Sequence, residues 1–105
     1  MSKEIVIPFN DWSRDRLCSG DKSATTRNKR YGEIGDYFEV DVGSEINTYE
    51  VLAVFPMILD DVARYLYHFE GAKNPKEFKQ IWCDIHKRAG WEPDRIVFVH
   101  LFFKV

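Results

Sequence analysis

Four residues between positions 20 and 27 combine groups that could carry out chemistry: Gly20, Lys22, Thr25 and Arg27. A glycine lets the backbone turn and approach a ligand closely. The ammonium of Lys22 becomes a usable base if burial lowers its pKa, and the hydroxyl of Thr25 becomes a nucleophile when a base takes its proton. The planar fork of Arg27 suits a carboxylate, a phosphate or the edge of a base. Side chains this close in sequence can converge on one pocket.

The same polar segment continues through Lys29, Arg30 and Tyr31 and ends at the Gly35-Asp36 pair. Loop lysines and arginines usually remain in solvent, so Lys29 and Arg30 are either surface charges or contacts to a ligand. The net charge of −2 and the pI of about 5.9 disfavour a general binder of phosphate backbones. We therefore expect no DNA partner, and any contact with RNA must be local.

The composition indicates one globular domain that spans residues 1–105, because 45% of the residues are hydrophobic. There is no apolar run of about eighteen residues, so we expect no membrane partner. The apolar run at residues 5–7 stops at Pro8, which is too short for a signal peptide. The two cysteines, Cys18 and Cys83, fall in helical patterns. They suit reduced thiols in a cytoplasmic protein better than a disulfide framework.

Alternating and β-branched segments predict the strands. Residues 5–9 form a short run closed by Pro8 and are predicted to be an edge strand. Residues 24–27 predict a brief strand, and residues 37–42 and 47–55 predict a hairpin that turns near Gly43. The long apolar segment at residues 95–105 predicts a central strand.

Three helices are predicted between these strands. The first runs from an Asn10 N-cap to Cys18. The second begins at a cap formed by Asp60 or Asp61 and carries apolar residues at helical spacing as far as Phe69.

The third helix has the clearest signals. Asn74 is its predicted cap, Pro75 its first residue and Glu77 the partner in a capping box, and Gly90 is predicted to end it. Strands interrupted by helices, with strong antiparallel signals, predict an α+β fold: a small curled sheet or open barrel flanked by helices.

The spacing Gly20-x-Lys22-x-x-Thr25-x-Arg27, followed by Gly35-Asp36, resembles the signature of ASCH domains, a branch of the PUA-like superfamily. The resemblance covers nearly the whole chain, and the segment EFKQIWCDIHKRAG takes the place of the helix before the last strand. It implies a small mixed or antiparallel β-barrel with flanking helices.

Small single-domain ASCH proteins include bacterial amidohydrolases that remove the acetyl group from 4-acetylcytidine. The resemblance implies that Lys22, Thr25 and a downstream glutamate are catalytic, with Lys22 taking the proton of Thr25. Glu70 matches that glutamate if one residue is inserted, whereas the rival Glu77 is already explained by capping. The resemblance implies no cofactor. Thr26 adjoins Thr25, so which hydroxyl points inward stays open.

The alternative is a non-catalytic RNA- or nucleotide-binding module. Its phosphate contacts would be Lys22, Arg27, Lys29 and Arg30, and Tyr31 or Trp91 would stack on a base. The expected partner is therefore a modified nucleoside or a single-stranded RNA segment, and the oligomeric state stays open. No metal site is expected, because Cys83 and His86 are only two ligands at a spacing of i, i+3, and two ligands without partners do not make a zinc site. His100, in the last strand, is interpreted as a core or barrel residue.

Overall fold

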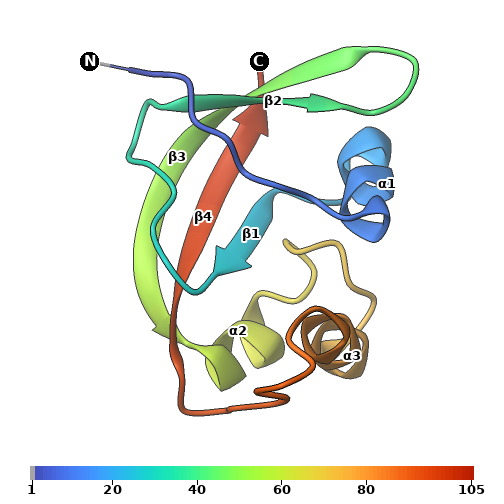
Figure 1. Cartoon of the computed structure of the whole chain (residues 1–105), viewed down its shortest axis with the longest axis vertical. Helices are drawn as coiled ribbons and strands as arrows, with labels where there is room; N and C mark the ends of the chain where they lie inside the picture. Colours follow the sequence, from blue (N-terminus) through green and yellow to red (C-terminus); the bar gives the residue numbers. More distant parts are fainter. Residues whose placement is uncertain (1) are drawn as a thin grey trace.

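The computed structural model describes residues 2–105. Its elements in chain order are α1 (Asp11–Ser19), β1 (Ala24–Arg27), β2 (Tyr37–Asp41), β3 (Ile46–Ile58), α2 (Leu59–Tyr65), α3 (Pro75–Ile85) and β4 (Ile96–Lys104). The strands form one antiparallel sheet in the order β1-β4-β3-β2, which curls around one side of the molecule (Figure 1). The predicted α+β fold with a curled sheet is confirmed.

The central position predicted for the last strand is also confirmed. β4 pairs with β1 on one side and with β3 on the other, and it places Thr25 opposite His100. The predicted hairpin forms between β2 and β3, with Phe38 opposite Tyr49. β3 is longer than predicted because its pairing with β4 continues to Ile58.

The edge strand predicted at residues 5–9 is wrong. Glu4 forms an isolated parallel bridge to Tyr37, and residues 5–9 belong to no strand. Pro8 has no N–H to give to a ladder, whereas Ile5, Ile7 and Phe9 are buried in a core cluster. The segment is therefore held mainly by its side chains, with one backbone hydrogen bond of 2.8 Å from the N–H of Ile5 to the carbonyl of Tyr37.

Two of the helix boundaries also differ from the prediction. α2 begins at Leu59, directly after β3, so Asp60 and Asp61 lie in its first turn instead of capping it. The helix ends at Tyr65, which leaves Phe69 outside it. α3 ends at Ile85 rather than Gly90, because His86 leaves the helical conformation while its N–H still binds the carbonyl of Trp82.

The predicted caps of α1 and α3 are confirmed, whereas the carboxylate of Glu77 accepts from the N–H of Lys73 and not from that of Asn74, so the predicted capping box is only half formed. Asn10 caps α1 by accepting a hydrogen bond from the N–H of Ser13, and Gly20 ends that helix with φ of 84°. Asn74 caps α3 in the same way through the N–H of Glu77. Within residues 2–105, no helix is long and apolar enough to cross a bilayer.

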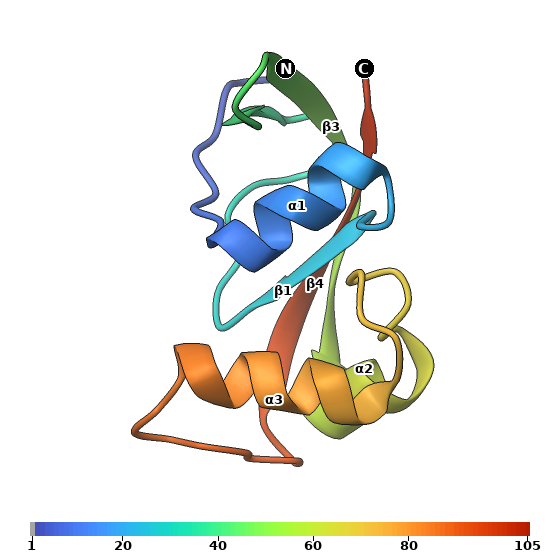
Figure 2. The same ribbon diagram turned by 90° about the vertical axis from the view of Figure 1, so that its right-hand side faces the viewer.

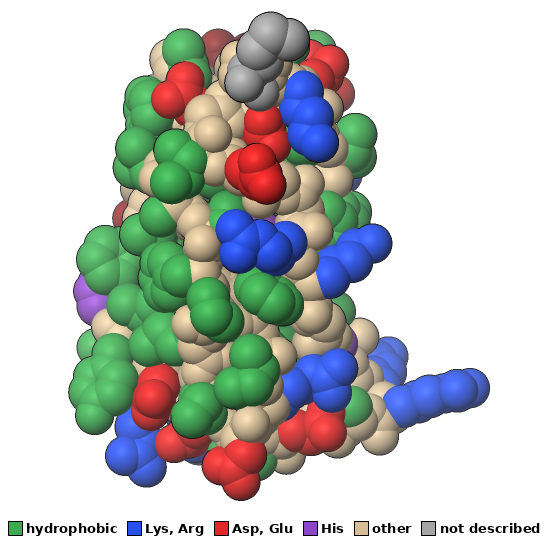
Figure 3. All heavy atoms as spheres, turned by 90° about the vertical axis from the view of Figure 1, so that its left-hand side faces the viewer, with side chains coloured by type: hydrophobic (Ala, Val, Ile, Leu, Met, Phe, Trp, Pro, Cys, Tyr) green, Lys and Arg blue, Asp and Glu red, His purple; other side chains and the backbone are tan. Residues whose placement is uncertain are grey.

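The helices all lie toward one side of the curled sheet. α1 and α3 flank β1, which passes between them (Figure 2). On the opposite side of the molecule, hydrophobic side chains share the surface with Lys and Arg and with Asp and Glu side chains (Figure 3). A cavity lies on the side that carries the helices.

Candidate functional site

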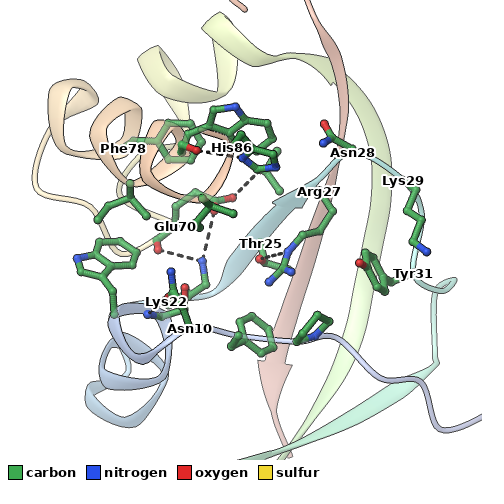
Figure 4. Close-up of a pocket in the computed structure, with 18 residues that line it drawn as sticks. Asn10, Lys22, Thr25, Arg27, Asn28, Lys29, Tyr31, Glu70, Phe78 and His86 are labelled. Atoms are coloured by element: carbon green, nitrogen blue, oxygen red, sulfur yellow. Dashed lines mark hydrogen bonds and ion pairs between the residues drawn. The ribbon is translucent and has the colours of Figure 1, made fainter. Parts of the chain in front are cut away.

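A cavity of about 570 Å³ opens between β1, α3 and the segment that leads into α1 (Figure 4). Aromatic and aliphatic side chains make up much of its wall, and its polar side chains come from residues 10–13, from residues 22–29, from the turn after α2 and from the end of α3. The lining residues are Pro8, Phe9, Asn10, Trp12, Ser13, Lys22, Thr25, Thr26, Arg27, Asn28, Lys29, Tyr31, Glu70, Phe78, Ile81, Trp82, Ile85 and His86. A pocket of this size that combines apolar walls with polar side chains suits a small organic ligand.

Lys22 and Glu70 form a buried ion pair in this cavity. The ammonium of Lys22 lies 3.3 Å from Oε1 of Glu70 and donates a second hydrogen bond, of 3.1 Å, to the backbone carbonyl of Glu70. Only 5% of Lys22 and 4% of Glu70 is exposed. Burial lowers the pKa of Lys22, the charge of Glu70 opposes this shift, and the charge of Arg27 adds to it.

The turn after α2 brings Glu70 to this position. The carbonyl of Phe69 accepts hydrogen bonds from the N–H groups of Ser23 and Ala24, so the turn is tied to the start of β1. Gly71 follows with φ of 93°, in the region that favours glycine. These contacts hold the carboxylate of Glu70 against the residues of β1.

Glu77 lies elsewhere. Its carboxylate accepts a hydrogen bond from the N–H of Lys73, and its own N–H donates to Asn74 at the start of α3. Of the two glutamates considered from the sequence, Glu70 is therefore the one in contact with Lys22.

The two threonines of β1 have different partners, although both are buried and both line the cavity. The hydroxyl of Thr25 accepts a hydrogen bond of 3.1 Å from Nε of Arg27. The hydroxyl of Thr26 donates a hydrogen bond of 2.7 Å to Oε2 of Glu70. Among the described residues, the ammonium of Lys22 is hydrogen-bonded to Glu70 and to neither threonine.

Arg27 lies between two aromatic rings. Its guanidinium carbon is 5.0 Å from the ring centre of Phe9 and 5.8 Å from that of Tyr31. Burial lowers the pKa of Arg27, and Tyr31 and Glu70 oppose this shift. Within residues 2–105, none of the ion pairs involves Arg27. A half-buried guanidinium without a carboxylate can bind an oxygen of a ligand.

His100 connects β1 with the loop that carries Tyr31. Its Nε2 accepts a hydrogen bond of 3.0 Å from the N–H of Tyr31, so Nδ1 carries the proton and donates to the carbonyl of Thr25 at 3.2 Å. The side chain is fully buried, and burial lowers its pKa. The prediction of a core residue is confirmed, but its contacts with both site segments could not be found from the sequence.

Six of the nine residues predicted for the site line the cavity: Lys22, Thr25, Arg27, Lys29, Tyr31 and Glu70. The other three lie outside its lining. Gly20 ends α1, Arg30 is exposed with its guanidinium over Phe98, and Trp91 packs edge-on against Phe78.

Sequence reasoning missed the aromatic wall. Trp82 and His86 stack with their ring centres 4.0 Å apart, and both line the cavity together with Trp12. The one-turn spacing of Trp82 and His86 was the available signal, but an apolar stripe on a helix also fits a core. No cluster of three or more potential metal ligands occurs among residues 2–105.

Solved structures share this architecture. The crystal structure of an ASCH domain from Lactobacillus crispatus JV V101 covers 98% of this chain and 79% of its own, with a TM-score of 0.63 and 14% identity. The chain has an ASCH-like fold. No protein-family model and no curated protein matches the sequence.

Two further structures share the ASCH-like fold. A protein of Enterococcus faecalis V583 assigned to the DUF984 family matches with a TM-score of 0.66 and 18% identity, over 99% of this chain and 79% of its own. The hypothetical protein PH0355 matches over the full length of both chains, with a TM-score of 0.70 and 12% identity. At these identities the likeness concerns the fold, so the function must be argued from the site.

Proposed function

We propose that this ASCH-like protein is an amidohydrolase that removes an acyl group from a modified nucleoside such as 4-acetylcytidine. The observation that carries the proposal is the buried contact between Lys22 and Glu70 beside two threonine hydroxyls in one cavity. Cleavage of an amide by covalent catalysis needs a nucleophile, a group that takes its proton and a group that protonates the leaving nitrogen. Residues of all three kinds lie in this cavity.

Three features of the cavity support a nucleoside as the ligand. Its walls are lined by aromatic rings, on which a planar base can stack. Among residues 2–105 the guanidinium of Arg27 forms no ion pair with a carboxylate, and it can stabilise the oxyanion that forms when the acyl carbonyl is attacked. A volume of about 570 Å³ lies within the range typical of sites for small organic molecules.

The resemblance to ASCH amidohydrolases assigns the nucleophile to the threonine at position 25. Lys22 and Glu70 then handle the protons, which suits a lysine whose pKa burial has lowered. The acyl group passes to the threonine oxygen, the amine of cytidine leaves, and water releases the acyl group as its acid.

Release of cytidine from 4-acetylcytidine by the purified protein tests this function. We expect turnover by the wild type and a loss of at least about 100-fold in kcat for Lys22→Ala and for Glu70→Gln. Glu77→Gln is the matched control, because this carboxylate caps α3 outside the cavity. A folded wild type that releases no cytidine would overturn the proposal.

The positive charge of the cavity favours a second candidate, a module that binds RNA or a nucleotide without catalysis. Lys22, Arg27 and Lys29 line the cavity against a single carboxylate, although the whole chain has a net charge of −2. Titration with a short single-stranded RNA at two salt concentrations separates the candidates. Affinity that falls steeply with salt indicates phosphate contacts, whereas affinity for a neutral nucleoside should hardly change.

A further inference from the structure

The two adjacent threonines of β1 both line the cavity, and their hydroxyls have different partners. Thr25 and Thr26 are 3% and 6% exposed, so burial does not separate them. Successive side chains of a strand point to opposite faces, which is why neighbours so close in sequence reach different partners. The partners therefore decide which oxygen is prepared to attack.

The hydroxyl oxygen of Thr25 is hydrogen-bonded to a cation, the guanidinium of Arg27. It accepts a hydrogen bond of 3.1 Å from Nε of Arg27, so one of its lone pairs is directed at a guanidinium. A lone pair held in this way is less available to a carbonyl carbon. Among the described residues, moreover, no side-chain base accepts a hydrogen bond from Thr25.

The hydroxyl of Thr26 is hydrogen-bonded to a base, the carboxylate of Glu70. It donates a hydrogen bond of 2.7 Å to Oε2 of Glu70, which is the contact expected of a hydroxyl beside its general base. The other carboxylate oxygen accepts from the ammonium of Lys22 at 3.3 Å. Lys22 therefore holds the carboxylate in an orientation that leaves Oε2 for Thr26.

From this geometry, and resting on the proposed amidohydrolase function, we infer that Thr26 rather than Thr25 is the nucleophile, with Glu70 as its general base. Oγ1 of Thr26 forms a bond to the acyl carbon while its proton passes to Oε2 of Glu70. The carbon–nitrogen bond then breaks, and the leaving nitrogen takes that proton from Glu70.

Hydrolysis of the acyl enzyme reverses these roles. Water adds to the ester carbon and gives a proton to Glu70, the ester bond to Oγ1 breaks, and Thr26 recovers its proton as the acid leaves. Glu70 takes up and releases one proton in each half-reaction, so it ends as a carboxylate, and the ammonium of Lys22 remains a hydrogen-bond donor throughout. Thr25 acts as a positioning residue, since its oxygen anchors Arg27 beside Phe9 and Tyr31.

Trapping the acyl enzyme locates the nucleophile without any substitution. The wild type is mixed with 4-acetylcytidine, quenched in acid and digested with trypsin, which cuts after Lys22 and Arg27 and releases residues 23–27. Both threonines lie in this peptide, and its C-terminal dipeptide fragment contains Thr26 without Thr25. We expect the mass of one acetyl group on that fragment.

Matched variants provide a second readout. We expect Thr26→Val to lower kcat at least about 100-fold and Thr26→Ser to retain most of it. Thr25→Val should instead raise KM and lower kcat less than about tenfold, because it loosens Arg27 without removing the attacking oxygen.

The outcomes separate the inference from the function on which it rests. An acetyl group on Thr25, or turnover with no acetyl adduct at all, would overturn the inference while the amidohydrolase function stands. A wild type without turnover would overturn both.

Discussion

The backbone N–H of Tyr31 donates a hydrogen bond of 3.0 Å to Nε2 of His100, a residue 69 positions later in the chain. The same imidazole donates from Nδ1 to the carbonyl of Thr25. One neutral histidine therefore fixes the position of the loop that carries Tyr31 relative to β1. A protonated imidazole has no lone pair to accept the hydrogen bond from Tyr31.

This relationship predicts that acid destabilises the fold. Burial lowers the pKa of His100 in the folded state, and Arg27 and Arg30 add to the shift, whereas the unfolded chain binds a proton at about pH 6.5. The unfolded state then holds more protons, so the free energy of unfolding falls as the pH drops below about 6.5 toward the folded-state pKa.

Urea unfolding between about pH 5 and about pH 8 measures this dependence. We expect His100→Gln to flatten the profile and His68→Gln, at an exposed histidine, to preserve it. An unchanged profile for His100→Gln would show that other groups cause the acid effect.

The ion pair between Lys22 and Glu70 predicts strong coupling in stability. Removing one partner of a buried pair leaves the other charge without compensation, so Lys22→Met and Glu70→Gln should each cost about 3–5 kcal/mol. The double variant should cost at least about 1 kcal/mol less than the sum of the two single variants. Denaturant midpoints of the four proteins give the coupling.

The pair between Arg64 and Asp60 is the control for this cycle. Its atoms are as close as 2.8 Å, but the side chain of Arg64 is 64% exposed, so its removal should change stability by about 0.5 kcal/mol or less. Additive losses at Lys22 and Glu70 would argue against a stabilising contact between them.

Substitution of Gly71, next to Glu70, tests whether the turn after α2 positions the carboxylate of Glu70. A Cβ at this residue would lie 2.7 Å from Cγ and 2.9 Å from Cβ of Arg16, in addition to the strain of φ near 93°. Gly43 has a similar φ of 102° with nothing within 4 Å, so Gly43→Ala should cost about 1 kcal/mol from the backbone alone.

We expect Gly71→Ala to cost at least about 1 kcal/mol more than Gly43→Ala, because Cβ and Cγ of Arg16 cannot swing away as the tip of that side chain could. Thermal unfolding of both variants measures the difference. Activity should fall at Gly71 and remain at Gly43. Equal losses of stability would mean that α1 moves aside without cost.

Substitutions of Tyr31 and of Trp91 are expected to differ in their effect on ligand binding. Tyr31 lines the cavity and lies beside Arg27, whereas Trp91 packs against Phe78 outside the lining. Loss of a stacked ring costs about 1–3 kcal/mol, so Tyr31→Leu should weaken nucleoside binding by about fivefold to about 150-fold, and Trp91→Leu should leave it within about twofold. Calorimetric titration with cytidine, the product that is not turned over, measures both, and the reverse order would place the base outside this cavity.

Local signals in the sequence determined several helix ends, the strand β2 and the cluster of site residues around β1 of this protein. Asn10, Gly20 and Asn74 mark helix ends through interactions with residues a few positions away, so these boundaries could be predicted. The alternation at residues 37–42 predicted a strand for the same reason. The close spacing of Lys22, Thr25 and Arg27 likewise placed these residues at one cavity.

Only the tertiary structure decided which residues of the site contact one another. The contact of Glu70 with Lys22 spans 48 positions and depends on hydrogen bonds from Ser23 and Ala24 to the turn after α2. The start of α2 depends on where β3 stops pairing with β4. Both the contact between Lys22 and Glu70 and the start of α2 therefore depend on distant segments and cannot be predicted from one segment alone. The partners of Thr25 and Thr26 differ for the same physical reason: hydroxyls of neighbouring residues are alike in sequence, and only the groups that the fold brings to them set their chemistry.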